Sequence, residues 1–383
     1  MTSPALPRER LVALDAFRGL TVAAMLLVNN PGTWSAIYPP LGHAPWHGWT
    51  PTDLIFPFFL FIVGITTHLS LTARRARGDD EAAIRRQILQ RGVLIILFGF
   101  LLSTFPYTPP SRFTDVRIPG VLQRIGVAYL CSALLTRRTS VKQQVAIIAV
   151  LLYGYWFAMT LLPVPGAAGG IGANLLDDPS RTLAAWVDRA LLDGHLWVGS
   201  KTWDPEGPLS TIPAIGTSML GVLAGRWIGS TRPLFERLSG LFAAGALAMV
   251  AGLMWHWSFP INKGLWTSSY VLFTGGMAAV SLATFTWIID AKGVPWWTRP
   301  LVIYGMNPMV AFVGSGMMAR TIYSLWKVEY GGKLVSVQSA TYQSVFASWL
   351  EPHNASLAFA VSFVLLWYGI LWVLWRQKLF LKV

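Results

Sequence analysis

The chain has 383 residues, of which 54% are hydrophobic and 12% are charged, and its formal net charge is +13. A soluble domain of this size could not cover so much apolar surface with so few polar side chains, so the composition excludes a soluble protein and predicts an integral membrane protein within a lipid bilayer. The basic residues lie between apolar runs rather than together on a soluble face, so nucleic acid is not expected as a partner.

Ten apolar runs follow one another along the chain, each bounded by charged residues, Pro or Gly. A hydrocarbon core of roughly 30 Å requires about 20 helical residues to cross it, and the runs are close to this length. They predict an all-α fold, a polytopic transmembrane bundle that forms a single domain over residues 1–383. The runs cover residues 13–33, 51–73, 88–106, 119–136, 144–163, 209–227, 238–258, 265–290, 301–321 and 355–375.

The distribution of Lys and Arg between the runs predicts the orientation of the chain. An even number of spans returns both termini to one side, and the connections on that side contain twenty Lys and Arg residues against eight on the other. Cytoplasmic connections are the ones enriched in these residues, so both termini are expected in the cytoplasm. The long connections 34–50, 164–208 and 322–354 then lie outside, and function is expected to face outward at least in part.

The external connection 164–208 contains a stretch with helical periodicity, residues 180–197. Its apolar side chains fall on one face and its charged side chains elsewhere, a pattern typical of a helix at the membrane surface. The apolar face would contain Leu183, Trp186, Val187 and Ala190, with Arg181, Asp188 and Arg189 away from it. We therefore expect an interfacial helix within this loop.

Polar side chains within or beside the apolar runs are the main functional candidates, because a charge in hydrocarbon is costly unless it is paired or hydrated. Asp53 ends the segment TPTD, which is equally consistent with a capped helix N-terminus and with a catalytic carboxylate. Arg18 and Arg91 lie near the cytoplasmic boundary, where they could extend to lipid headgroups or bind a ligand. Arg124 lies deeper within its run and requires a buried partner or a ligand.

Two histidines, His43 and His47, lie in a short external segment, HAPWHGW, between runs whose ends carry Asn29 and Asp53. An imidazole there could act as a general base near neutral pH, with a neighbouring amide or carboxylate orienting its tautomer. The spacing of the two histidines could also suggest a metal site, but no third ligand has plausible spacing, so no metal is expected. The single cysteine, Cys131, lies inside an apolar run and is interpreted as a packing residue.

Six segments carry further motifs, in this order: LDAFRGLTVAAMLLVNN, HAPWHGWTPTDLIFPFFLFIVG, VRIPGVLQRIGVAYL, WDPEGPLSTIPAIGTSMLGVLAGRW, FPINKGLWTSSYV and YGMNPM. They resemble the successive signatures of the heparan-α-glucosaminide N-acetyltransferase family and cover most of the membrane domain. The short termini resemble those of bacterial members, some described as components of N-acetylglucosamine uptake systems. The resemblance therefore implies the bacterial inner membrane.

The lysosomal member of this family transfers an acetyl group from cytosolic acetyl-CoA across the membrane to the amine of a terminal glucosamine. The resemblance thus implies an acyltransferase with acetyl-CoA as co-substrate and a glucosamine-containing sugar as acceptor. The family's catalytic histidine corresponds to His43, whereas His47 falls where the lysosomal relative has asparagine. The family's asparagine and aspartate correspond to Asn29 and Asp53. A homodimer is expected on the resemblance alone.

These residues suggest a chemical outline for acetyl transfer. His43 would remove the amine proton, Asn29 would stabilise the developing oxyanion or position the sugar, and Asp53 would orient the imidazole or the sugar. A covalent acetyl-imidazole at His43 is the competing mechanism.

The residues expected to bind the two substrates follow from position and chemistry. Phosphates of acetyl-CoA need polar partners, and a planar guanidinium forms paired bonds with phosphate, so the candidates are Arg18, Arg91 and, deeper, Arg124. The acceptor candidates are Trp46, Asp204, Glu206, Lys263 and Asn307. The alternative from another class is a transporter for an amino sugar or N-acetylglucosamine, although the sequence shows no pair of interrupted helices in two similar halves.

Overall fold

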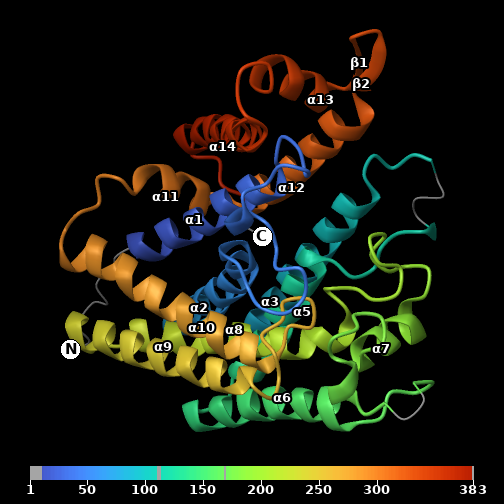
Figure 1. Cartoon of the computed structure of the whole chain (residues 1–383). Helices are drawn as coiled ribbons and strands as arrows, with labels where there is room; N and C mark the ends of the chain where they lie inside the picture. Colours follow the sequence, from blue (N-terminus) through green and yellow to red (C-terminus); the bar gives the residue numbers. More distant parts are fainter. Residues whose placement is uncertain (1–10, 110–113, 168–169, 382–383) are drawn as a thin grey trace.

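The computed structural model describes residues 11–109, 114–167 and 170–381, and helices dominate it. Most of the long helices run side by side between two ends of the molecule (Figure 1). The predicted fold class, an all-α polytopic bundle, is confirmed. Four basic residues that contribute to the charge comparison lie outside the described residues: Arg8, Arg10, Arg112 and Lys382.

Several helices in the first half of the chain begin at a side chain that accepts a backbone N–H and so satisfies a donor at the helix start. Asp80, Ser140 and Thr182 have this role at the starts of α3, α6 and α7. The elements are α1 (Val12–Asn29), η1 (Pro39–Leu41), η2 (Pro51–Leu54), α2 (Ile55–Ala76), α3 (Glu81–Thr104), α5 (Val121–Thr136), α6 (Val141–Leu161), η3 (Gly172–Leu175) and α7 (Leu183–Leu192).

In the second half, proline occupies the first position of several helices, where its missing N–H removes no internal bond. Pro208, Pro308 and Pro352 begin α8, α12 and α14 in this way. The elements are α8 (Pro208–Ile228), α9 (Leu234–His256), α10 (Ser268–Thr286), η4 (Trp287–Ala291), α11 (Arg299–Met306), α12 (Pro308–Arg320), η5 (Thr321–Leu325), β1 (Lys327–Tyr330), β2 (Lys333–Ser336), α13 (Val337–Thr341), η6 (Tyr342–Phe346) and α14 (Pro352–Arg376).

All ten predicted runs form helices, but the helices differ in length. Among the described residues, eight helices are long and apolar enough to cross a membrane. The ninth run is divided into α11 and α12, which are bent by 80° across Asn307, so it adds at most one span. The fourth run is α5, whose 16 residues fall short of the same criterion. Length and composition therefore support eight or nine spans instead of the ten predicted.

Two helix pairs approach closely through glycine. In the pair α2 and α8, a Cβ added to Gly64 or Gly221 would lie 1.9 or 2.0 Å from a carbonyl oxygen of the facing helix. In the pair α1 and α11, a Cβ added to Gly19 or Gly305 would likewise lie within 2.2 Å of a carbonyl oxygen of the facing helix. Membrane helices associate through small residues of this kind because their backbones can then pack directly. These contacts fix α1 and α2 at the ends joined by the connection 34–50, where Asn29 ends α1 and Asp53 lies in η2, just before α2.

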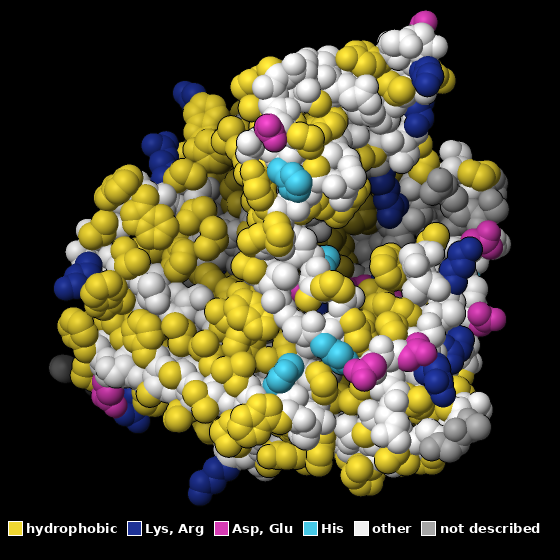
Figure 2. Space-filling view, in the orientation of Figure 1, with side chains coloured by type: hydrophobic (Ala, Val, Ile, Leu, Met, Phe, Trp, Pro, Cys, Tyr) yellow, Lys and Arg dark blue, Asp and Glu magenta, His cyan; other side chains and the backbone are white. Residues whose placement is uncertain are grey.

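Several helices expose much of their apolar surface. Only 22% of the apolar window of α9 and 28% of those of α3 and α14 are buried. A broad hydrophobic surface covers the left side of the molecule in Figure 2. Such an area on a soluble monomer would cause association, whereas in a bilayer it faces lipid. The chain is therefore a multi-pass membrane protein.

The long connections predicted outside the membrane gather toward one end of the bundle. In Figure 1, α7 and the antiparallel hairpin β1–β2 lie toward the right, whereas the start of α1 and the connection from α10 to α11 lie toward the left. The N–H of Gly48 donates to the carbonyl of Ile261 over 2.8 Å, which joins the connection 34–50 to the segment between α9 and α10. Segments far apart in the sequence therefore form one surface.

The helix predicted in the external connection is present as α7, but it is oriented differently. Its buried residues are Ala184, Ala185 and Asp188, whereas Trp186 is 37% exposed. Asp188, which the pattern groups with charged side chains away from the apolar face, is therefore an inward-facing residue. The small side chains of α7 allow it to pack against α6 and α8, and this carboxylate is buried at the contact.

Candidate active site

A cavity of about 610 Å³ lies between the connections predicted outside the membrane and the helices. Its outer wall includes residues 43–46, 203 and 263–264, and its inner wall includes residues of α1, α2, α5 and α12. The face drawn in Figure 2 is hollowed near its centre, with charged and histidine side chains around the hollow. Pockets of several hundred Å³ with apolar walls and a few polar groups are typical of small-molecule sites.

His43 and Asp53 form a hydrogen-bonded pair in the wall of this cavity. His43 Nδ1 lies 2.6 Å from Asp53 Oδ1, and the side chains are 52% and 1% exposed, respectively. A carboxylate beside Nδ1 favours the tautomer that carries its proton there, so we assign the N–H to Nδ1. Nε2 is then the nitrogen that is available to a ligand.

The second oxygen of Asp53 fixes the connection that carries His43. Oδ2 accepts the N–H groups of Ala44 and Thr50, each over 3.0 Å, and the hydroxyl of Thr50 over 3.1 Å. Thr50 and Asp53 thereby form a capping box at the start of η2. Asp53 thus caps the turn with one oxygen and contacts the imidazole with the other.

Lys263 contacts both members of this pair. Its Nζ lies 3.0 Å from His43 Nδ1, 3.3 Å from His43 Nε2 and 3.5 Å from Asp53 Oδ1. A point almost equally distant from both ring nitrogens lies above the ring, because the same point in the ring plane would overlap a ring carbon. The Lys263 nitrogen therefore lies over one face of the imidazole. Burial lowers the pKa of Lys263, and the charges of Asp53 and Glu206 oppose that effect.

Asn29 and Asn30 both lie at the end of α1, but they have different surroundings. The Asn30 amide donates to the carbonyl of Leu26 over 2.8 Å and its side chain is buried. Asn29 is exposed and lines the cavity. Asn29 can therefore offer its amide to a ligand in the cavity that His43 also lines, whereas Asn30 satisfies its own helix.

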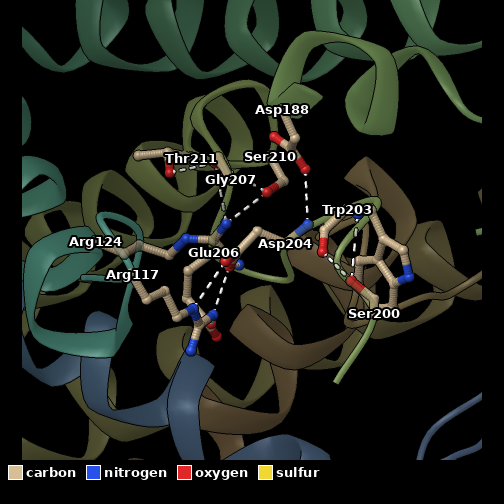
Figure 3. Close-up of polar contacts among 10 residues, drawn as sticks. All are labelled: Arg117, Arg124, Asp188, Ser200, Trp203, Asp204, Glu206, Gly207, Ser210 and Thr211. Atoms are coloured by element: carbon tan, nitrogen blue, oxygen red, sulfur yellow. Dashed lines mark hydrogen bonds and ion pairs between the residues drawn. The ribbon is translucent and has the colours of Figure 1, made fainter. Parts of the chain in front are cut away.

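On the opposite part of the wall, Arg117 binds two acidic residues (Figure 3). Its Nε and one terminal nitrogen contact the two oxygens of Asp204 over 2.8 and 2.5 Å, and the same nitrogen contacts Glu206 over 2.5 Å. Burial alone would lower the pKa of Arg117, but these bonds and charges raise it above its usual range. Arg117 and Glu206 line the cavity, whereas Asp204 is buried behind them.

Arg124 lies behind this wall and does not reach the cavity. Its side chain is buried, and one terminal nitrogen donates to the Ser210 hydroxyl over 2.5 Å and to the Gly207 carbonyl over 3.3 Å. The guanidinium carbon lies 5.1 Å from the centre of the Trp266 ring. The buried partner that the sequence requires is therefore a set of polar groups from α8 and the face of an indole.

Three tryptophans form an aromatic part of the outer wall. Trp46 and Trp203 meet edge to face with centroids 5.2 Å apart, and Trp203 meets Trp197 with centroids 5.9 Å apart. All three line the cavity. The indole nitrogen of Trp46 donates to the carbonyl of Leu176 over 2.8 Å, which fixes the ring against the connection 164–208. This row offers flat apolar surface to a ligand in the cavity.

His47 does not line the cavity. Its Nε2 lies 2.9 Å from Asp177 Oδ1, and its Nδ1 lies 3.2 Å from the amide of Asn262. Asn262 also donates to the carbonyl of Trp46 over 3.0 Å. His47 therefore helps to join the connection 34–50 to the connection 164–208 and to the segment between α9 and α10.

Arg18 and Arg91 lie outside the described wall of the cavity. Arg18 donates to the carbonyl of Gly305 over 2.9 Å and lies 3.4 Å from Asp15. Thr21, three residues further along α1, lines the inner part of the cavity. Arg91 lies over the ring of Tyr129 with 5.2 Å to the ring centre. Of these two, only Arg18 lies within about one helical turn of a cavity residue on its own helix.

Asn307 lies at the break between α11 and α12 and binds the C-terminal segment. Its amide nitrogen donates to the carbonyl of Leu379 and its oxygen accepts from the N–H of Leu381, both over 3.0 Å. The side chain is 1% exposed and is not part of the cavity wall, although the next two residues, Pro308 and Met309, are. The structure does not bring Asn307 together with the other acceptor candidates.

Arg117 is one of the polar residues beside an apolar run and so belongs to the class of functional candidates, but the sequence assigns no role to it or to Asp188. A signal for Arg117 was present, since it is a basic residue beside a span on the side with few basic residues. Asp188 gave no such signal, because a carboxylate in an amphipathic segment ordinarily faces solvent.

The chemistry available at this site is acid–base chemistry with electrostatic support. An oriented imidazole, an exposed amide and an ammonium group line one cavity, together with an arginine that is bound by two carboxylates. Within the described part of the chain, no group of three or more His, Cys, Asp or Glu side chains is arranged to bind a metal ion. Such a set can accept a proton and stabilise a developing negative charge.

The chain is similar to known proteins over nearly its whole length. Residues 10–176, which include Asn29, His43 and Asp53, match the family model described as heparan-alpha-glucosaminide N-acetyltransferase, catalytic. The mouse heparan-alpha-glucosaminide N-acetyltransferase is 31% identical over 424 aligned positions, which cover 98% of this chain and 61% of the mouse protein. The human protein of the same name is 30% identical over 425 positions, with 99% and 60% covered. The chain therefore spans about three fifths of the length of these relatives.

Proposed function

Since this chain belongs to the heparan-α-glucosaminide N-acetyltransferase family, we propose that it is a transmembrane N-acetyltransferase acting on a glucosamine-containing sugar. The acetyl donor is acetyl-CoA from the cytoplasm, and the acceptor binds on the side where the connection 34–50 lies. Residence in a bacterial inner membrane and a homodimeric state belong to the same proposal.

The observation that supports this function most directly is the His43–Asp53 pair at the cavity. Acetyl transfer to an amine requires a base that is oriented, partly accessible and held close to other polar groups. His43 meets these conditions, because Asp53 fixes Nδ1 and the half-exposed ring lines the cavity. His47, four residues later, does not line it.

In the proposed reaction, the amine nitrogen of the sugar attacks the carbonyl carbon of the thioester and a C–N bond forms. His43 Nε2 takes one proton from the nitrogen, and Asp53 stabilises the resulting imidazolium through Nδ1–H. When the tetrahedral intermediate collapses, the C–S bond breaks and the proton passes from His43 to the sulfur. The products are the N-acetyl sugar and the CoA thiol, and His43 is neutral again.

Two cavity residues would stabilise the negative charge that develops on the carbonyl oxygen during this step. The exposed amide of Asn29 can donate a hydrogen bond, and the ammonium of Lys263 lies beside His43. Positioned donors of this type lower the barrier because they need no reorganisation when the charge appears. Glu206 and the tryptophans Trp46 and Trp203 would contact the sugar.

For the nucleotide end of acetyl-CoA, we propose Arg18 as a phosphate-binding residue. Arg18 lies near the cytoplasmic end of α1, and Thr21 on the same helix lines the inner cavity. The thioester would then approach His43 from the inner side. That Arg91 and Arg124 bind acetyl-CoA, and that Asn307 binds the acceptor, stay predictions.

The test is acetylation of glucosamine by the purified protein in detergent with radiolabelled acetyl-CoA. We expect His43→Gln to lower kcat about a hundredfold or more, because a general base typically contributes roughly 10²–10⁴ in rate. His47→Gln is the matched control and should keep kcat within a few-fold of the wild type.

Equal rates for wild type and His43→Gln would contradict the assigned base. If the wild type gave no turnover but proteoliposomes containing it accumulated the sugar, the transporter would replace the enzyme. Exchange of labelled CoA into acetyl-CoA without sugar would instead favour an acetyl-imidazole at His43 over direct transfer.

A further inference from the structure

Asp188 lies behind the arginine wall of the cavity and is one of the most deeply buried acidic side chains described. It belongs to the external helix α7 and is 1% exposed. Its Oδ2 accepts the main-chain N–H of Asp204 over 2.8 Å, whereas its buried Oδ1 has no hydrogen-bond partner. A Cβ added to Gly207 would lie 2.1 Å from Oδ1, so the segment 204–207 packs directly on this carboxylate.

The residue held by Asp188 is the one that orients Arg117 (Figure 3). Asp204 accepts from Arg117 with both carboxylate oxygens, and its Oδ1 also accepts the N–H of Glu206 over 2.9 Å. Glu206 in turn contacts Arg117. Displacement of the Asp204 backbone would therefore move the carboxylate that fixes the guanidinium.

The hydrogen bond to the Asp204 N–H does not by itself require a carboxylate, because an asparagine of the same size could accept it without a buried charge. Burial raises the pKa of Asp188 to about 7, and the hydrogen bond from the Asp204 N–H opposes that effect. The negative charge of Asp204 raises the pKa further, whereas the charges of Arg124 and Arg189 lower it. Tyr155 on α6 is a further titratable group that interacts electrostatically with Asp188. The strength of the bond to Asp204 therefore changes near neutral pH, since a charged acceptor binds an N–H more strongly than a neutral one.

We propose that Asp188 is a positioning residue for the acceptor. Through the Asp204 main chain it holds Arg117 and Glu206 in the geometry that the sugar contacts. This assignment rests on the proposed function for the identity of the ligand, but the geometry it describes exists without any reaction.

The first test measures binding of glucosamine to the purified protein without acetyl-CoA, through the fluorescence of the cavity tryptophans. Asp188→Ala removes the acceptor of the Asp204 N–H, and we expect binding about tenfold weaker, the effect of losing one hydrogen bond to a charged group. Asp188→Asn should match the wild type at pH 5.5 and bind several-fold more weakly at pH 8.5, where only the wild type is charged.

Asp193→Asn is the matched control, because Asp193 is exposed at the end of the same helix. It should follow the wild type at both pH values. Unchanged binding by Asp188→Ala, or a ratio of Asp188→Asn to wild-type affinity that is the same at both pH values, would overturn the proposal.

A second measurement needs neither ligand nor activity. The pKa of Asp188 is higher in the folded protein than the value of 3.8 for an isolated Asp, so its protonated form stabilises the fold and wild-type stability decreases as pH rises toward 7. Asp188→Asn should therefore unfold at the same temperature as the wild type at pH 4 and at a higher temperature at pH 8. Absence of acetyl transfer in the wild type would contradict the proposed function but leave both measurements valid.

Discussion

The connection 34–50 contains two histidines that each contact a carboxylate, and their surroundings separate them. Asp53 is 1% exposed, whereas the side chain of Asp177, the partner of His47, is 93% exposed. Water competes for an exposed carboxylate, so a hydrogen bond to it fixes an imidazole only weakly. The fold therefore holds a buried carboxylate against His43, whereas the buried partner of His47 is the amide of Asn262.

Asp53→Asn tests this difference. The substitution keeps the size of the side chain and one acceptor oxygen for the capped turn, but it removes the charge that fixes the Nδ1–H tautomer and stabilises the imidazolium. We expect kcat for acetyl transfer to fall about a hundredfold or more. The measurement is the initial rate at saturating acetyl-CoA and glucosamine.

Asp177→Asn is the matched control, since it changes the other histidine–carboxylate pair. It should keep the wild-type rate. A loss as large in Asp177→Asn as in Asp53→Asn would mean that the rate reports the integrity of the external loop rather than the orientation of a base.

Part of this site could be predicted at the residue scale because its members are close in the sequence. Asn29, His43 and Asp53 lie at the ends of two adjacent runs joined by a short connection, so both the spacing and the family motif point to them. Lys263, Glu206 and Arg117 come from distant segments, and only the packed fold shows which of them meet His43 and which form a separate wall. The role of Asp188 becomes visible only from the orientation of α7, and the side-chain pattern predicted that orientation wrongly.

At the scale of elements, hydropathy located every long helix but not its continuity, and it gave no sign of the hairpin β1–β2 or the short helix α13 in the connection 322–354. A run of apolar residues does not show that Asn307 and Pro308 interrupt the ninth segment, because both occur within an otherwise hydrophobic stretch. Pro308 has no N–H for a bond within α11, and Asn307 binds the C-terminal segment instead. The bend places Pro308 and Met309 in the cavity wall, so the interruption contributes directly to the site.

The pair α1 and α11 provides an element-scale prediction. A Cβ on Gly19 would lie 1.7 Å from the carbonyl oxygen of Leu301, so Gly19→Val should force the two helices apart. Overpacking of this kind costs typically 1–3 kcal/mol, and we expect a lower unfolding temperature in detergent. Gly154→Val on α6 is the matched control, because a Cβ at Gly154 meets nothing within 4 Å. A Gly19→Val protein as stable as the control would contradict the close contact.

At the scale of the whole molecule, the cavity covers only part of the membrane thickness. Asn29 and Thr21 line it along α1, and they are eight positions apart, which corresponds to about 12 Å of helix. The hydrocarbon core measures roughly 30 Å. The remaining part of α1, which includes Arg18, lies beyond the inner end of the cavity, and under the proposed function it would lie beside the route of the donor to His43.

The orientation of the chain is also a property of the whole molecule, because the number of membrane crossings between two positions determines whether they lie on the same side. Between Arg77 and Lys333 lie α3, α5, α6, α8, α9, α10 and the bent pair α11 and α12. If all seven units cross, the two positions lie on opposite sides, and failure of either α5 or the bent pair to cross would put them on the same side. We expect the two positions on opposite sides, because the charge distribution requires it. Ten crossings satisfy this, as do the eight long helices alone, whereas nine do not.

The measurement uses single cysteines and a membrane-impermeant maleimide on intact cells. Cys131→Ala removes the one native cysteine, and Arg77→Cys or Lys333→Cys adds a thiol at an exposed position in that background. We expect Lys333→Cys to be labelled in intact cells and Arg77→Cys only after permeabilisation, with no labelling of the cysteine-free protein. The same result at both positions in intact cells, whether both are labelled or both are protected, would show that one of the two short units does not cross. Labelling of Arg77→Cys alone would invert the topology and place His43 in the cytoplasm.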